Sequence, residues 1–341
     1  IIKKLRANGH TYEANGSIYF KLSTFAKYGQ LSKFKLDELK TGASGRVDSD
    51  EYETEDARDF ALWKAYDEDD GAVFWETDLG KGRPGWHIEC SCMSMKYLGE
   101  SFDIHCGGID NMFPHHENEI AQSEAATGKP FVKYWLHSAH LLVDGRKMSK
   151  SFGNFYTLRD LIEKGHDPKA IRWTLIATHY RQPSNFTFDA LEAATESLRR
   201  VRDFRQRLEE VRTAGDGLGE LDLTCEKHFG DTLDDDLNIS GAIGSVFDFV
   251  RETNKLIDSD IIGKGGAQRA LALLDRLDAV TGLFGAGAKE ETPAEVLALV
   301  SERQQARRAK DFKRADEIRD QLLAMGWVLE DTPDGPRVKK A

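Results

Sequence analysis

Apolar residues in the second half of the chain recur at three- and four-residue steps, which is the spacing of one face of an α-helix. Between residues 191 and 211 this spacing is followed by Leu191, Ala194, Leu198, Val201, Phe204, Leu208 and Val211. The pattern predicts a long amphipathic helix, which the glycine-rich stretch 215–219 ends. Similar spacing predicts two further helices over residues 240–257 and 267–283. Together these amphipathic helices indicate a helical bundle.

The first half of the chain alternates between strand and helix patterns. Strands are predicted over residues 16–22 and 102–105. Helices are predicted over residues 33–40, 86–98 and 115–127. Gly128 closes the last of these helices, and the apolar stretch 134–143 predicts a buried segment before a turn at Asp144 and Gly145. This alternation indicates an α/β layer whose site lies at the strand ends.

Local signals fix several helix ends. Residues 1–9 have the pattern of a helix end stopped at a glycine. Thr157 is suited to cap a helix over residues 158–164, and Pro168 suits the first turn of the next helix. After a linker-like stretch, helices are predicted over 294–309 and 312–325 and short strands over 327–331 and 336–338.

These patterns predict an α/β fold in several parts. We expect an α/β domain over residues 1–142, and the family resemblance given below implies that it is a partial nucleotide-binding (Rossmann-like) domain with its insertion. A phosphate loop and connecting helical region follow over 143–186, a helical bundle over 187–288, and a small α+β unit over 293–341. With 341 residues, two or three units are expected, each large enough to bury its own core.

Composition narrows the class of protein. The formal net charge of −11 argues against bulk, unspecific affinity for nucleic acid, although local basic patches remain compatible with a nucleic-acid partner. Acidic runs at 48–56 and 67–70 are expected to be solvated loops. No apolar run is long enough to cross a bilayer and no signal peptide is recognisable, so we expect a cytoplasmic protein without a membrane partner.

The cysteines and histidines suggest a metal site. His115 and Glu119 are four residues apart, so on a helix they share one face, and Cys90 adds a thiolate from a separate helix. A thiolate, an imidazole and a carboxylate suit zinc. His116 is expected to point about a quarter turn away and is the weaker candidate. The alternative is that these are ordinary buried or surface side chains.

The other cysteines are weaker candidates for a ligand. Cys92 and Cys225 fit an ordinary structural role better, and Cys106, beside two glycines, fits either. The small number of cysteines favours a reducing compartment over a disulfide framework.

A lysine-rich loop follows the predicted turn at Asp144 and Gly145. Lys147 and Lys150 are three residues apart in the sequence Lys-Met-Ser-Lys-Ser, between Gly145 and Gly153. Two lysines on a mobile loop can close over a polyphosphate and neutralise charge that builds up during displacement at a phosphate.

These motifs together resemble one enzyme family. Lys147 to Ser151 matches the second signature of class I aminoacyl-tRNA synthetases, and three blocks resemble cysteinyl-tRNA synthetases, at residues 82–90, 102–105 and 113–122. The resemblance continues through His179-Tyr-Arg, Asp235-Asp-Leu-Asn and residues 326–331.

The resemblance implies a function and a set of site residues. Such enzymes activate L-cysteine with ATP, together with Mg²⁺, and transfer it to cysteine tRNA. One zinc ion, held here by Cys90, His115 and Glu119, would bind the thiolate of the substrate. The hydroxyl of serine cannot reproduce this interaction, so the zinc would distinguish cysteine from serine. The implied substrate pocket contains Trp86, His105 and Asp110. The implied catalytic lysines are Lys147 and Lys150, with Lys150 on the ATP.

The same resemblance points to two candidate tRNA surfaces. The implied anticodon contacts are Arg307, Phe312, Asp316 and Asp331. The long helix also carries a run of arginines, Arg199, Arg200, Arg202, Arg205 and Arg207. They could contact the tRNA backbone, and a solvated helix face is an equal alternative.

Two features of the family pattern are missing from these residues. The His-x-Gly-His signature and the first zinc cysteine are expected upstream, so we expect these residues alone to lack part of the ATP site. Two other functions stay open: a ligase that joins cysteine to a sugar amine, and an inactive tRNA-binding fragment. Binding of tRNA would argue against the first.

Overall fold

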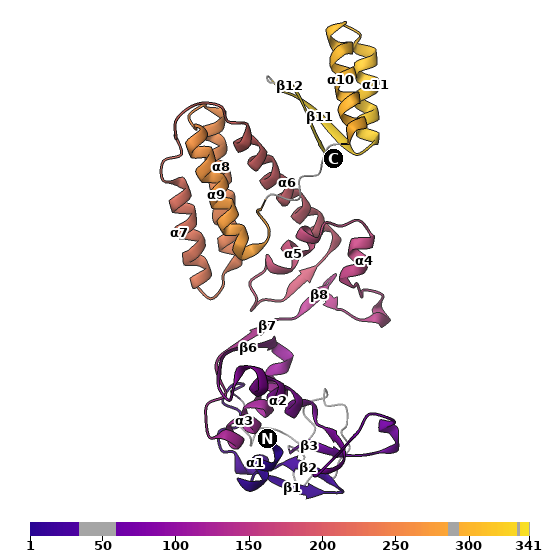
Figure 1. Cartoon of the computed structure of the whole chain (residues 1–341), viewed down its shortest axis with the longest axis vertical. Coiled ribbons are helices and arrows are strands. Elements are labelled where there is room, and N and C mark those ends of the chain that lie inside the picture. Colours follow the sequence, from indigo (N-terminus) through magenta and orange to yellow (C-terminus); the bar gives the residue numbers. More distant parts are fainter. Residues whose placement is uncertain (34–58, 286–292, 333–334, 341) are drawn as a thin grey trace. The chain divides into compact units, whose positions relative to one another are not determined.

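The computed structural model describes residues 1–33, 59–285, 293–332 and 335–340. The predicted helix at 33–40, the acidic run at 48–56 and nearly all of the linker at 285–292 lie outside the described residues. The chain divides into two compact units, Ile1–Leu273 and Leu274–Ala341, the helices and strands of which are labelled in Figure 1.

The first unit opens with a short helix and an antiparallel sheet. Helix α1 (Ile2–Ala7) precedes strands β1 (Thr11–Ala14), β2 (Ser17–Phe20), β3 (Phe60–Ala65), β4 (Trp75–Thr77) and β5 (Gly80–Pro84). Their order in the sheet is β1-β2-β3-β5-β4, with every neighbouring pair antiparallel. The helix end before Gly9 and the strand within 16–22 are confirmed, whereas the other four strands were not predicted. The acidic run at 67–70 is largely exposed, but it forms a 3-10 turn, Glu68–Asp70, capped by Asp67.

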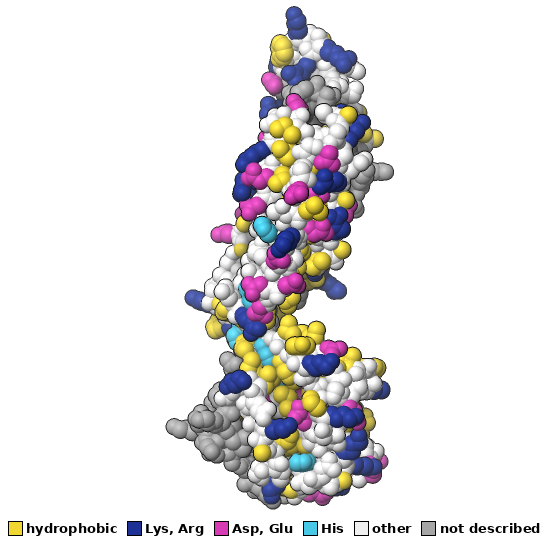
Figure 2. Space-filling view, turned by 90° about the vertical axis from the view of Figure 1, so that its left-hand side faces the viewer, with side chains coloured by type: hydrophobic (Ala, Val, Ile, Leu, Met, Phe, Trp, Pro, Cys, Tyr) yellow, Lys and Arg dark blue, Asp and Glu magenta, His cyan; other side chains and the backbone are white. Residues whose placement is uncertain are grey.

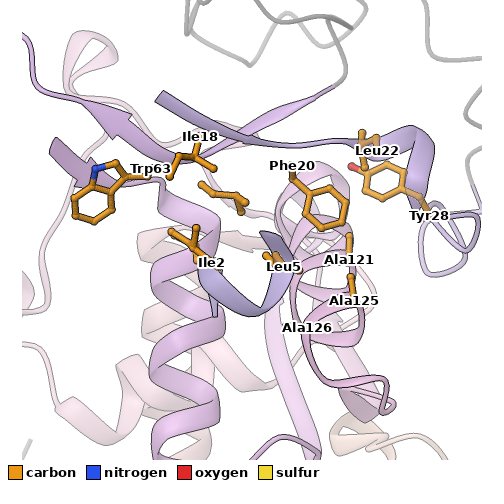
Figure 3. Close-up of a cluster of buried hydrophobic side chains, with 12 residues drawn as sticks. Ile2, Leu5, Ile18, Phe20, Leu22, Tyr28, Trp63, Ala121, Ala125 and Ala126 are labelled. Atoms are coloured by element: carbon orange, nitrogen blue, oxygen red, sulfur yellow. The ribbon is translucent and has the colours of Figure 1, made fainter. Parts of the chain in front are cut away.

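A hydrophobic core joins this sheet to the helix that carries Glu119, one of the candidate metal ligands. Figure 3 shows Ile2 and Leu5 of α1 beside Ile18 and Phe20 of the sheet. Helix α3 (Glu117–Thr127) contributes three buried alanines, Ala121, Ala125 and Ala126. Small side chains let a helix backbone approach its neighbours closely, so this face of α3 is anchored in the core.

A parallel strand pair forms the α/β layer. Helix α2 (Trp86–Leu98) leads to β6 (Phe102–Gly108), and β6 pairs in parallel with β7 (Val132–Ser138) across α3. The predicted helices at 86–98 and 115–127 are confirmed, although the second is regular only from Glu117, after a π-helical turn at Met112–His116.

The prediction that residues 134–143 form a buried segment is wrong in part. The segment is broken between β7 and β8 (Leu141–Val143), and Tyr134 is 65% exposed. Alternate side chains of a strand point to opposite faces of its sheet, so an apolar composition does not bury them all.

A second small sheet carries the lysine-rich loop. Strand β8 lies between β9 (Arg146–Lys147), which is antiparallel to it, and β10 (Ser184–Phe186), which is parallel. The turn at Asp144 and Gly145 is confirmed, with positive φ at both residues. Helices α4 (Leu158–Glu163) and α5 (Pro168–Ile176) follow, and Thr157 and Pro168 start them as predicted.

Four helices follow in sequence. They are α6 (Phe188–Glu210), α7 (Leu221–Asp234), α8 (Ile239–Asp258) and α9 (Lys264–Thr281). The apolar face predicted for the long helix is buried from Leu191 to Leu208, and α7 was not predicted. Among the described residues, no helix is both long enough and apolar enough to cross a membrane.

Two motifs singled out in the sequence meet beside this bundle. Arg181 donates from Nε and Nη2 to the carboxylate of Asp236, at 2.5 and 3.1 Å, and the Tyr180 hydroxyl donates to Asp236 Oδ1 at 2.7 Å. The backbone N–H of Ala139 donates to the Tyr180 carbonyl at 2.7 Å. The segment around Tyr180 is therefore bonded both to the end of β7 and to the α7–α8 loop.

The second unit contains the end of α9, two further helices and a hairpin. Helices α10 (Ala294–Arg308) and α11 (Phe312–Ala324) pack on the antiparallel strands β11 (Trp327–Thr332) and β12 (Gly335–Lys340). Their shared core contains Val296, Leu299, Ile318, Leu322, Trp327 and Leu329. All four predicted elements are present within a few residues of their predicted ends.

Candidate metal centre and phosphate loop

A buried carboxylate lies at the centre of the candidate metal site. The side chain of Glu119, in the first turn of α3, is 0% exposed. Its Oε1 lies 2.8 Å from Nε2 of His115, and its Oε2 lies 3.3 Å from Nε2 of His105. Burial by itself would raise the pKa of Glu119, but the two facing histidine rings outweigh burial and hold that pKa at about 2. The group is therefore an anion at neutral pH.

The structure brings the three predicted metal ligands together. Ligand atoms of Cys90, His115 and Glu119 all lie within 4.8 Å of one another. Cys90 comes from α2, and His115 lies one helical turn before Glu119, on the face expected from their spacing. Two segments separated in sequence, α2 and the helical stretch 112–127, thus converge on one point.

His116 is a stronger candidate ligand than the sequence suggested. His105, His116 and Glu119 form a second group whose ligand atoms also lie within 4.8 Å of one another, so His116 faces the same carboxylate. Gly107 makes this possible, because a Cβ there would lie 2.6 Å from Cε1 of His116. The prediction that His116 points away and is the weaker candidate therefore does not remove it from the site.

Two further histidines were missed by sequence reasoning. Nδ1 of His87 lies 2.8 Å from Nδ1 of His115, and Nε2 of His137 lies 2.8 Å from Nδ1 of His116. The rings of His115 and His116 are thus each held by another histidine, as neighbouring side chains commonly hold metal-binding imidazoles in position. The pKa of His116 falls to about 4 mainly through burial, which the other histidines reinforce and Glu119 opposes, so this ring is neutral at pH 7.

Two of the three predicted substrate-pocket residues, Trp86 and His105, contact this cluster. The Trp86 ring is 62% exposed, and its centroid is 4.5 Å from that of His115. His105 contacts Glu119 directly. Asp110 is exposed in the turn after β6, and its carboxylate lies against Gly108. An open aromatic side chain above a buried ligand set can cover a small molecule held there.

The cysteines differ in accessibility. Cys92 and Cys106 are exposed, and Cys225 is buried with its Sγ 3.6 Å from the Ser245 carbonyl oxygen. Burial, followed by the negative charges of Glu119 and Glu89, raises the pKa of Cys90 to about 11. Without a metal, Cys90 is therefore a protonated thiol at neutral pH.

This difference gives a testable prediction for protein stripped of metal. At about pH 8, where an unperturbed thiol is partly ionised, iodoacetamide should alkylate the exposed Cys92 and Cys106 well before Cys90. Because the pKa of Cys90 is raised, its alkylation should accelerate only as the pH approaches 11. Mass spectrometry of the alkylated peptides measures the three rates, and equal rates for Cys90 and Cys92 at pH 8 would contradict the prediction.

The lysines of the candidate phosphate loop are exposed. Lys147 ends β9, and Lys150 begins a short 3-10 turn, Lys150–Phe152. The Lys150 Nζ lies 5.5 Å from the centroid of the Phe155 ring. No hydrogen bond or ion pair among the described residues joins either lysine to the Glu119 cluster.

The candidate anticodon residues lie around the α10–α11 turn. Arg307 is in the last turn of α10, and Phe312, 61% exposed, is the first residue of α11. Asp316 is exposed one turn later. Asp331 lies in β11, and its side chain is outside the described part of the chain. Three of the four candidates are therefore accessible at one end of the helix pair.

The arginines of α6 are largely engaged within the protein. Arg199 pairs with Glu196 and Asp203, Arg207 pairs with Asp258, and Arg205 is buried. Arg200 lies 3.5 Å from Glu196, and Arg202 lies 3.8 Å from Asp167. The face drawn in Figure 2, which is the α7 side of Figure 1, likewise has basic side chains interleaved with acidic ones. These observations favour the solvated, ion-paired helix face over a path for the tRNA backbone.

Three family models match successive parts of the chain and agree on one family of enzymes. Residues 1–196 match the family model described as the tRNA synthetases class I (C) catalytic domain. Residues 228–285 match the DALR domain, and residues 289–338 match the cysteinyl-tRNA ligase anticodon binding domain.

Curated relatives agree with these matches. The cysteine–tRNA ligase of Brachyspira hyodysenteriae is 50% identical, in an alignment that covers 100% of this chain and 73% of the relative. That of Chlamydia felis is 49% identical, with 96% of this chain and 69% of the relative covered.

A solved structure supports the fold class. The LeuRS of Agrobacterium radiobacter K84, solved as a ternary complex with tRNA and LeuAMS, superposes with a TM-score of 0.50 at 14% identity. The match covers 65% of this chain and 35% of that one, and it bears on the fold alone. The predicted α/β class, with its helical and C-terminal parts, is confirmed.

Proposed function

The chain belongs to the cysteine–tRNA ligase family, and we propose that it activates L-cysteine with ATP and joins it to cysteine tRNA, with zinc recognising the substrate thiolate. The observation that carries the proposal is the convergence of Cys90, His115 and Glu119. The match of residues 289–338 to an anticodon-binding model favours tRNA over a sugar amine as the acceptor.

The donor atoms fit a zinc ion. Both oxygens of Glu119 are fully buried, and among the described residues they face only the imidazole nitrogens of His115 and His105, which are themselves candidate ligands. A buried carboxylate with unused acceptor capacity is costly unless a cation satisfies it. Sulfur, imidazole nitrogen and carboxylate oxygen are the donors that zinc accepts. Bound zinc would supply a positive charge that favours a thiolate over a hydroxyl.

The remaining residues have supporting roles in this proposal. His87 orients the His115 ring, and Trp86 covers the substrate. Lys147 and Lys150 bind the triphosphate of ATP and its Mg²⁺, and Lys150 stabilises the charge that develops during adenylation. Arg307, Phe312, Asp316 and Asp331 contact the anticodon.

We keep the proposed division of the chain. Residues 1–142 belong to the catalytic domain, 143–186 to the phosphate loop and connecting helices, 187–288 to the bundle, and 293–341 to the anticodon unit. In this proposal the catalytic domain selects the amino acid, the phosphate loop activates it, and the anticodon unit binds the tRNA.

The test is cysteine-dependent exchange of pyrophosphate into ATP by the enzyme that contains this chain. Cysteine should be preferred to serine by on the order of 10⁴-fold in kcat/KM, because sites built around one specific polar interaction reject an analogue that lacks it by about that factor. Removal of zinc should abolish this preference. Equal exchange with serine, or exchange that does not depend on zinc, would contradict the proposal, and charging of cysteine tRNA tests the second step.

A further inference from the structure

One buried side chain beneath the lysine-rich loop has no role in the function proposed above. Asn154 is 9% exposed and follows Gly153, whose φ of +66° ends the 3-10 turn. Its Nδ2 donates to the carbonyl oxygens of Val143 at 3.3 Å and Lys147 at 3.2 Å. Its Oδ1 accepts from the backbone N–H of Ser149 at 2.9 Å. The NH₂ group and the oxygen of this side-chain amide are therefore both hydrogen-bonded to the backbone.

The three backbone groups belong to different parts of the loop. Val143 is the last residue of β8 and is buried, Lys147 is the last residue of β9, and Ser149 caps the turn that starts at Lys150. Asn154 thus bonds to the end of β8, to Lys147 itself and to Ser149, the residue before Lys150. The loop also has internal bonds, since the Ser151 N–H donates to Ser149 Oγ at 3.3 Å.

The lysine side chains themselves have little to hold them. Both are exposed, and neither has an ion pair among the residues that the structure describes. Their position over a bound polyphosphate therefore depends on the backbone that carries them. Errors of about 1 Å in the position of a reacting group can cost about 100-fold in rate.

We propose that Asn154 is a positioning residue, which sets the backbone of Lys147 and Ser149 so that the lysines meet the phosphates of ATP. The proposal rests on the function proposed above. It assigns Asn154 no contact with substrate, because its amide is occupied by the loop backbone.

The chain offers a matched control in Asn185. Its Oδ1 accepts from the backbone N–H of Gly145 at 2.8 Å, at the turn of the same β8–β9 hairpin. It bonds to neither Lys147 nor Ser149 in the described contacts. Asn185→Ala loosens the hairpin at its turn and leaves the amide of Asn154 in place, so it separates hairpin stability from lysine position.

Steady-state pyrophosphate exchange tests the proposal. Asn154→Ala should lower kcat by about 10- to 100-fold and leave the KM for cysteine within about twofold. Asn185→Ala should leave both constants within about twofold. A wild-type kcat in Asn154→Ala, an equal loss in Asn185→Ala, or a loss confined to the KM for cysteine would overturn the proposal.

A second variant and a second measurement cover loss of folding or of activity. Asn154→Asp keeps an acceptor for Ser149 but sets a carboxylate oxygen against two carbonyls, so it should also lower kcat if Asn154→Ala does not fold. Hydrogen exchange at the Ser149 amide should accelerate in Asn154→Ala and not in Asn185→Ala, and unchanged protection would overturn the proposal. Wild-type enzyme without exchange activity would contradict the proposed function, and this amide measurement would still decide the role of Asn154.

Discussion

Replacing Glu119 with glutamine is expected to lower the zinc affinity of the protein by more than about 100-fold, since even the loss of a side chain that only orients a metal ligand typically costs 10- to 100-fold. Glutamine has nearly the same size as glutamate, so the fold should survive. It removes the charge that faces His105 and His115 and offers one weaker acceptor oxygen in place of two carboxylate oxygens. The measurement is competition for zinc against a chromophoric chelator.

Glu117 provides the control for this experiment. It is also buried in the first turn of α3, but its carboxylate accepts from the backbone N–H groups of Gly29 and Ser32 and from the Ser32 hydroxyl. Glu117→Gln should therefore lower the midpoint of thermal unfolding and leave zinc affinity unchanged. Equal zinc affinity in Glu119→Gln and wild type would remove Glu119 from the metal site, and an equal loss in both variants would indicate a general effect on α3.

Much of the fold was predictable because its signals are local. The long helix α6 has a continuous apolar stripe, and Thr157 and Pro168 mark helix starts through hydrogen bonds and backbone angles within a few residues. Strands β3 and β5 were missed because their stability comes from partners distant in sequence, such as the pairing of Trp63 with Pro84. Helix α7 was missed for a different reason, since it buries a mixed set that includes Asp222 and Cys225.

The candidate site, like the fold, was predictable where its signals are local and not where they depend on distant segments. The spacing of His115 and Glu119 was sufficient to place them on one face, and Cys90 was associated with them by donor chemistry. The place of His116 depends on Gly107, and the partner of His116 is His137, which lies opposite Gly107 in the register of β6 and β7. No single segment contains that arrangement, because it arises only when the two strands pair.

Replacing Lys150 with alanine is expected to lower kcat for pyrophosphate exchange by about 10²- to 10³-fold, the usual cost of removing one group that stabilises charge in a transition state. Lys150 is exposed and its ammonium group has no ion pair among the described residues, so its charge is uncompensated in the free protein. An ammonium group held only by a contact with the Phe155 ring is available to a polyphosphate without first breaking an ion pair. The KM for cysteine should stay unchanged, because no described hydrogen bond or ion pair joins this lysine to the Glu119 cluster.

Two further variants decide whether the effect belongs to this position. Lys164→Ala removes an exposed lysine just after α4 and should leave kcat unchanged, which controls for the loss of one positive charge. Lys150→Arg keeps the charge but changes the geometry of its donors, and it should restore part of the rate. If Lys164→Ala lowered kcat as much as Lys150→Ala, the lysines would act only through the general charge of the protein. If Lys150→Ala kept a wild-type kcat, the developing charge would have to be stabilised by Lys147 or by a group outside the loop.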